Sequence, residues 1–151
     1  MSDKRRVARL DLGDDQPSPE PLRKRSGVRA RETSLDALVL VVDDDTLMRE
    51  AMRRMVSRRH RAIDAPDAAT AIALCVQQRP DVVVSDFDMP GANGRRLAEL
   101  LTIALGDEAP PVIIVTGGDL SRAAGSGIVR VLPKPLGLDT LLDALDEALQ
   151  S

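Results

Sequence analysis

Short apolar runs separated by polar segments recur along the chain from residue 37 onward. A weak run covers Arg61–Asp64, and four stronger ones lie at 38–42, 82–86, 112–115 and 128–132. Runs of this length that are rich in Val, Ile and Leu and end at Asp, Gly or Pro are typical of strands buried on both faces. The pattern therefore predicts five strands.

Apolar residues at helical spacing occupy the segments between these strands. The expected helices cover 45–59, 67–78, 95–105, 119–124 and 138–149. The fourth is barely longer than one turn, because Gly125-Ser126-Gly127 follows it. Strands that alternate with helices predict βαβ units with right-handed crossovers. The fold class is therefore α/β, a five-stranded parallel sheet with helices on both faces and a shortened fourth helix.

Two groups of charged residues outside the apolar pattern predict solvent-exposed parts of the chain. The first 35 residues contain Pro17-Ser18-Pro19-Glu20-Pro21 and small basic clusters, which predict a disordered N-terminal tail, 1–35, before a single domain, 36–151. A docking arm for an acidic partner is the alternative for the tail. On the helix at 45–59, Arg49 and four further arginines face away from the apolar stripe. They predict a solvated surface, with docking again the alternative.

Composition narrows the class of protein. One Phe, no Tyr and no Trp leave an aliphatic core, and the single Cys75 excludes an internal disulfide or a four-cysteine metal site. The longest apolar run, 37–42, is too short to span a bilayer, and no apolar stretch typical of a secretion signal lies near the N-terminus. We therefore expect a cytoplasmic protein without membrane contact. A net charge of −3 gives no electrostatic reason to expect nucleic-acid binding.

The carboxyl ends of the strong strands carry residues suited to phosphoryl chemistry. Asp43 and Asp44, Asp86, Thr116 and Lys134 follow or end four of them, and open α/β sheets bind ligands at this edge. A carboxylate can accept a phosphoryl group, and Mg²⁺ held by carboxylates neutralises its charge. We predict that Asp86 is the nucleophile, beside Mg²⁺ on Asp43 and Asp44. Thr116 and Lys134 would contact the phosphoryl oxygens.

From Leu38 to Leu149 the sequence resembles the receiver domain of bacterial two-component response regulators, most closely the single-domain chemotaxis type. The motifs that carry the resemblance are Val41-Val42-Asp43-Asp44-Asp45, Asp86-x-x-Met89-Pro90-x-x-x-Gly94, Val115-Thr116-Gly117 and Lys134-Pro135. The resemblance implies a doubly wound, flavodoxin-like sheet of strand order 2-1-3-4-5.

The same resemblance implies the site and the partners. Asp86 would take its phosphoryl group from a phosphohistidine of a sensor histidine kinase or a histidine phosphotransfer protein. Mg²⁺ would bind Asp43, Asp44, Asp86 and the backbone carbonyl of Asp88. Such a domain signals by protein–protein interaction in a phosphorelay. It is not a conventional enzyme, since it catalyses only its own phosphoryl transfer and dephosphorylation.

The chain departs from the family's pattern at the expected readout. Receivers that couple Thr to an aromatic ring carry that ring three residues before the Lys, where this chain has Val131. The segment from Thr116 to Lys134 is also shorter than usual. Asp88, two residues past the acceptor, adds a carboxylate at the rim.

Three other functions are alternatives to this one. The departures favour a phosphorylation-independent interaction module on the same fold. Asp86-Phe87-Asp88 also resembles the nucleophile motif of haloacid dehalogenase-like phosphatases, but there the acidic pair follows the Lys, and here Asp43 and Asp44 come first. Since nothing after Leu149 is long enough for a helix-turn-helix, direct DNA binding is not expected.

Overall fold

Five parallel strands form the centre of the fold. The computed structural model describes residues 36–150; the predicted tail lies outside them. The strands are β2 (Leu38–Val42), β3 (Arg61–Ala65), β4 (Val82–Asp86), β5 (Val112–Thr116) and β6 (Ile128–Pro133). They pair in the order β3-β2-β4-β5-β6. When the five strands are numbered 1 to 5 along the chain, this order is 2-1-3-4-5. The predicted α/β class and doubly wound parallel sheet are confirmed.

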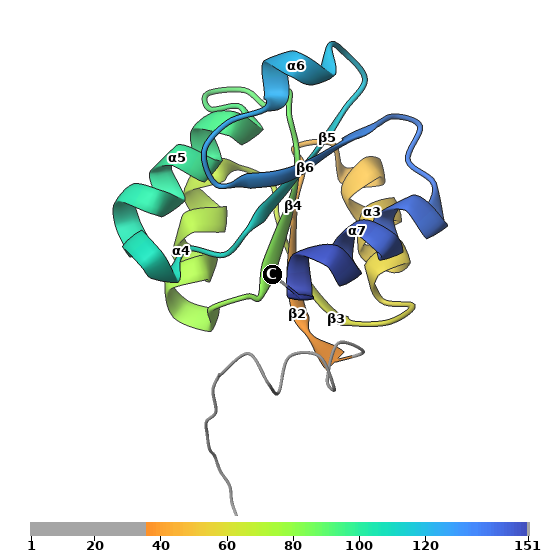
Figure 1. Ribbon diagram of the computed structural model, residues 1–151, viewed down its shortest axis with the longest axis horizontal. Helices are drawn as coiled ribbons and strands as arrows, with labels where there is room; N and C mark the ends of the chain where they lie inside the picture. Colours follow the sequence, from red (N-terminus) through yellow and green to blue (C-terminus); the bar gives the residue numbers. More distant parts are fainter. Residues whose placement is uncertain (1–35, 151) are drawn as a thin grey trace, which may run out of the picture. The chain divides into compact units, whose positions relative to one another are not determined.

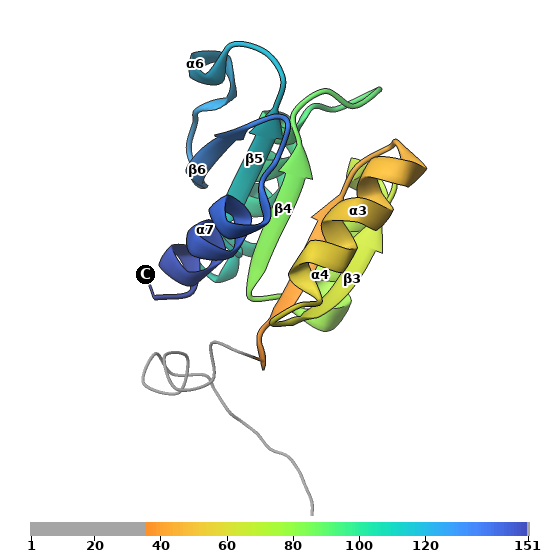
Figure 2. The same cartoon turned by 90° about the vertical axis from the view of Figure 1, so that its right-hand side faces the viewer.

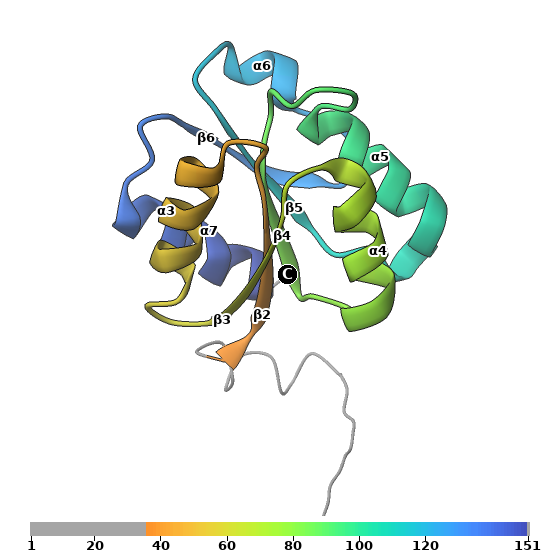
Figure 3. The ribbon, with the colours of Figure 1, turned by 180° about the vertical axis from the view of Figure 1, so that it is seen from behind.

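Helices cover both faces of the sheet (Figures 1 and 3). On one face lie α3 (Thr46–Val56) and α7 (Leu138–Gln150), and on the other α4 (Ala68–Gln78) and α5 (Gly94–Leu105). A 3₁₀ turn, η3 (Gly106–Glu108), follows α5. The predicted shortening of the fourth helix is confirmed, because α6 (Leu120–Ala123) has four residues; Figure 2 shows it beyond the end of β5.

Aliphatic side chains fill the two layers between sheet and helices. β4 and β5 are buried along their whole length, as expected for strands covered on both faces. One layer packs side chains of β2, β4 and β5 against α4 and α5, including Leu40, Val83, Ile114, Leu97 and Leu101. The other packs them against α3 and α7, including Val41, Val84, Val115, Met52 and Leu145. Phe87, the single aromatic residue, belongs to the first layer.

Side-chain caps fix where three helices begin. Asp45, Asp67 and Asn93 each accept a hydrogen bond from a backbone N–H in the first turn of α3, α4 and α5, which satisfies donors that a helix leaves free. At its other end α3 stops at Val56 rather than near residue 59. The N–H groups of Arg58 and Arg59 bond three residues back, so the chain tightens into a turn that leads into β3.

No helix within residues 36–150 has the length and apolar character needed to cross a membrane.

Candidate functional site

An ion pair between a buried carboxylate and a partly buried lysine lies at the carboxyl edge of the sheet. Asp86 ends β4 and is 5% exposed, and the Nζ of Lys134 donates a hydrogen bond to its Oδ1 over 2.8 Å. The backbone N–H of Lys134 also donates to the carbonyl of Thr116 at the end of β5, and the Lys134–Pro135 peptide bond is cis. Two neighbouring strand ends therefore hold the lysine above the carboxylate.

Burial and charge act in opposite directions on this lysine. Burial alone would lower the pKa of Lys134, but the hydrogen bond from Lys134 to Asp86 and the charges of Asp86, Asp43 and Asp88 together raise it. The side chain therefore stays cationic across the physiological pH range.

Two further carboxylates complete an acidic cluster. Within the described part of the chain, one oxygen from each of Asp43, Asp44 and Asp86 lies within 4.8 Å of the others. Asp43 is buried and Asp44 is exposed. Burial raises the pKa of Asp43, and repulsion from Asp86 and Asp44 adds to that rise, while the Asp45 N–H and Lys134 oppose it. Like charges at this spacing favour a bound cation.

The atoms of Asp43 fit the binding of a hard cation. Its backbone N–H donates to the carbonyl of Ala65 over 3.2 Å, and its Oδ1 accepts from the N–H of Asp45 over 2.9 Å. Its Oδ2 is buried and has no hydrogen-bond partner within residues 36–150. A buried carboxylate oxygen without a partner is costly. Mg²⁺ takes oxygen ligands, usually one or two carboxylates together with waters and phosphate oxygens, so these residues fit that ion.

Thr116 lies on the other side of Asp86, on the neighbouring strand β5. It ends β5 and is 2% exposed, and its Oγ1 accepts a hydrogen bond from the N–H of Gly118 over 3.0 Å. Because that oxygen is the acceptor, the hydroxyl proton stays available for donation to another group.

Close packing behind Asp86 explains the glycine at position 94. The N–H of Gly94 donates to the carbonyl of Phe87 over 2.9 Å. A Cβ at Gly94 would meet Ile114 Cδ1 at 2.6 Å and the Asp86 carbonyl oxygen at 2.8 Å. Any side chain there would press on the backbone of Asp86.

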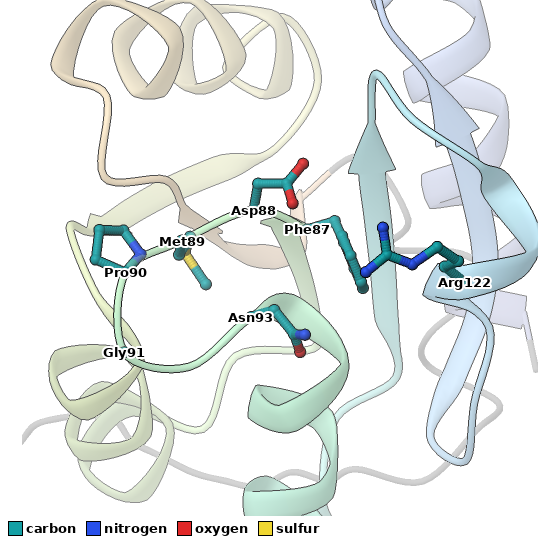
Figure 4. A pocket seen from close by; sticks show the side chains of 7 residues that line it. All are labelled: Phe87, Asp88, Met89, Pro90, Gly91, Asn93 and Arg122. Carbon is teal, nitrogen blue, oxygen red and sulfur yellow. The ribbon is translucent and has the colours of Figure 1, made fainter.

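An open pocket of about 510 Å³ lies beside the loop that follows Asp86 (Figure 4). Its lining includes Asp88, Met89 and Asn93 from that loop and Arg122 from α6. The guanidinium of Arg122 reaches over the ring of Phe87, 5.8 Å from its centroid, a distance at which cation and ring attract. The short helix α6 therefore contacts the loop that follows Asp86 directly.

The structure brings together Asp43, Asp44, Asp86 and Lys134 and places Thr116 at the end of the strand beside Asp86. Asp88 is exposed on the rim, and the ligand role of its carbonyl stays a prediction. Sequence reasoning missed Arg49, which bonds to the acidic loop instead of facing solvent. Cys75 is buried, and burial raises the pKa of its thiol to about 11, in keeping with a packing role.

Comparison with known proteins gives one consistent family. The model of the response regulator receiver domain matches residues 39–146. Response regulator MprA of Mycobacterium sp. (strain KMS) is 37% identical over 108 residues, which are 69% of this chain and 46% of that protein. The chain thus spans about half the length of the curated relatives it matches.

Solved structures agree on the fold. The receiver domain of the NarL response regulator from Mycobacterium tuberculosis has a TM-score of 0.70 at 24% identity, covering 77% of this chain and 98% of that one. Chemotaxis protein CheY4 of Vibrio cholerae has a TM-score of 0.68 at 24% identity, covering 74% and 98%. The family match sets aside the haloacid dehalogenase alternative. From residue 39 to residue 146 the chain belongs to the response regulator receiver domain family, a family of two-component signalling domains.

Proposed function

We propose that Asp86 accepts a phosphoryl group from a phosphohistidine and that the chain transmits this state by binding other proteins. The observation that carries the proposal is the buried Asp86 carboxylate, paired with Lys134 over 2.8 Å and flanked by Asp43 and Asp44. A carboxylate nucleophile, a mobile cation and a cation site within one cluster supply the groups that phosphoryl transfer requires.

The transfer exchanges one phosphorus bond for another. An oxygen of Asp86 forms a bond to phosphorus while the phosphorus–nitrogen bond to the donor's imidazole breaks. The bonding pair leaves with the nitrogen, and the imidazole returns to its neutral or protonated form in solvent. Attack of water on the same phosphorus later releases inorganic phosphate and restores the carboxylate of Asp86.

This chain's own side chains stabilise the transferred group. Lys134 already pairs with Asp86 and can move its ammonium to a phosphoryl oxygen. The Thr116 hydroxyl has a free proton to donate to another oxygen. Asp43, Asp44 and Asp86 would hold Mg²⁺, with the carbonyl of Asp88 as the further ligand that the family resemblance implies. That ion, when bound, neutralises the charge on the transferring oxygens.

Intact mass spectrometry tests the proposal. The chain is incubated with acetyl phosphate or phosphoramidate and Mg²⁺, and one added phosphoryl group is expected. Asp86→Asn should abolish the addition and keep the fold. Asp143→Asn, the same change at an exposed position on α7, is the matched control and should label like the wild type. Labelling of the Asp86→Asn variant would contradict the assignment.

A phosphorylation-independent interaction module is the second candidate. Val131 and the four-residue α6 favour it, because they alter the surface through which a receiver reports its state. The labelling experiment separates the two, since this candidate predicts no phosphoryl addition with either acetyl phosphate or phosphoramidate.

A sensor histidine kinase or phosphotransfer protein is the proposed phosphoryl donor for the first candidate. The predicted single-domain form stays a prediction, since the curated relatives are about twice as long as the matched segment.

A further inference from the structure

Arg49 contacts two parts of the structure that meet at the acidic loop. It lies in the first turns of α3, and its side chain is 17% exposed. Its Nε donates to Asp64 Oδ2 over 2.8 Å, and its Nη1 donates to the backbone carbonyl of Asp43, also over 2.8 Å. One guanidinium therefore joins α3, the end of β3 and the residue that follows β2.

These bonds leave Asp43 with a single free polar atom. Its N–H is held by Ala65, its carbonyl by Arg49 and its Oδ1 by the N–H of Asp45. Among the described residues Oδ2 alone finds no hydrogen-bond partner, and it belongs to the cluster that includes Asp44 and Asp86. Because the rest of the residue is fixed, this oxygen has little freedom to turn away from its neighbours.

Arg49 opposes the repulsion between the carboxylates of the acidic cluster. The carboxylates of Asp44 and Asp86 push against that of Asp43, and this force would open the loop in the absence of a cation. The Arg49 bond opposes that movement through the backbone, where it does not compete for Oδ2. Asp64 compensates the guanidinium charge, so the arginine adds little repulsion toward a cation.

We infer that Arg49 is a positioning residue for the cation site, and that it acts by holding the backbone of Asp43 so that Oδ2 stays directed at the ion. The inference rests on the proposed function, since it requires that the cluster binds Mg²⁺. It assigns no contact between Arg49 and the ion.

The direction in which Mg²⁺ affinity changes when Arg49 is replaced separates a positioning role from a purely electrostatic one. If Arg49 acted only through its charge, Arg49→Met would remove a cation near the site and Mg²⁺ would bind more tightly. Positioning predicts the opposite, and losses of about 10- to 100-fold are usual when a residue that orients a metal ligand is removed. A role confined to fold stability would change the free energy of unfolding and leave the affinity of the folded protein unchanged.

The experiment is a Mg²⁺ titration of the folded protein, followed through the backbone amide signals of residues 43–45 by NMR. Arg49→Met should weaken binding about tenfold. Arg54→Met is the matched control, because Arg54 lies on the same helix, is 85% exposed and pairs with Glu50 at 3.8 Å, its one ion-pair partner within residues 36–150. The Mg²⁺ affinity of this variant should equal that of the wild type. Unchanged or tighter binding in Arg49→Met would overturn the inference.

Arg49→Lys keeps the test decisive if the methionine variant does not fold. Lysine retains the charge but lacks the two-armed geometry that reaches Asp64 and the Asp43 carbonyl together, so a smaller loss of Mg²⁺ affinity is expected. Wild-type affinity in Arg49→Lys would show that a point charge suffices and would refute the two-bond mechanism. If the wild type itself bound no Mg²⁺ and took no phosphoryl group, the proposed function would fail instead.

Discussion

Replacing Gly94 by alanine should distort Asp86, the proposed phosphoryl acceptor, through direct contact with its backbone. The new Cβ would lie 2.6 Å from Ile114 Cδ1 and 2.8 Å from the Asp86 carbonyl oxygen. Ordinary van der Waals contact begins at 3.4 Å, so these atoms must separate by about 0.8 and 0.6 Å. The Ile114 methyl can rotate, whereas the Asp86 carbonyl belongs to a buried strand and moves only with β4.

Because the Asp86 carbonyl cannot move aside, Gly94→Ala should lower the free energy of unfolding. Overfilling a packed core costs about 1 to 3 kcal/mol, and the loss of glycine's freedom in the unfolded chain offsets about 0.4 to 1 kcal/mol of it. A net loss of about 1 to 2 kcal/mol in the free energy of unfolding should result. For a domain of this size, each kcal/mol lowers the melting temperature by about 4 °C.

Urea unfolding and phosphoryl incorporation from acetyl phosphate measure the two effects. Gly137→Ala is the control, because its nearest contact would be an ordinary 3.6 Å to Thr140 Oγ1. In Gly94→Ala/Ile114→Val the clashing methyl is absent, so the double variant should lose less stability than the sum of the single changes. It should still label slowly, since the contact with Asp86 remains. Wild-type stability and labelling in Gly94→Ala would refute the reasoning.

Three further predictions concern pH, charge and exchange. Neutral His60 accepts a hydrogen bond from the N–H of Ala37, and burial lowers its pKa. The contribution of His60 to stability should therefore be present above pH 6.5 and be lost as the pH falls below that value. In His60→Gln, which removes the chain's single histidine, urea unfolding should show no such loss of stability at low pH. Without Mg²⁺, Asp44→Ala should be as stable as the wild type or more so, because it relieves repulsion, yet a Mg²⁺ titration should show lost binding. Beryllofluoride, a phosphoryl mimic, should increase amide protection across residues 117–127 and change little around Val131; equal exchange in that loop would favour the phosphorylation-independent module.

The strands were predictable from sequence because both faces of the sheet are covered. A strand buried on both faces is nearly continuously apolar, and β4 and β5 begin with three and four apolar residues before their polar carboxyl ends. The same pattern predicted which residues end the strands, so Asp86 and Thr116 were placed correctly at the carboxyl edge. Strand order came from the family resemblance, because apolar runs do not encode which strands are neighbours.

The end of α3 was predicted less well, since local pattern does not include tertiary demands. Arg58 and Arg59 continue the polar stripe of the helix, yet the chain must turn there to enter β3. Arg59 also pairs with Asp146 on α7 over 2.8 Å, a contact that no local pattern contains.

The supporting residues of the site were not predictable for the same reason. Arg49 belongs to a stripe of arginines that reads as a solvated face, and only the fold brings Asp64 within its reach. The need for glycine at position 94 comes from Ile114 and Asp86 on two different strands. The burial of His60 depends on the chain that enters β2.

The packing of the sheet determines which parts of the site can respond to a phosphoryl group. The strands β2, β4 and β5 are held by apolar layers on both faces, and each large buried side chain stabilises the fold by about 1.5 to 3 kcal/mol. That stabilisation keeps the repelling carboxylates of Asp43 and Asp86 side by side and prevents the strands from moving apart. A change of charge at Asp86 must therefore act on the loops after the strands. Of these, the loop after β5 leads into α6, whose Arg122 lies over Phe87, the residue directly after the acceptor. With Val131 in place of a ring, this contact gives the acceptor loop a direct connection to the surface of α6.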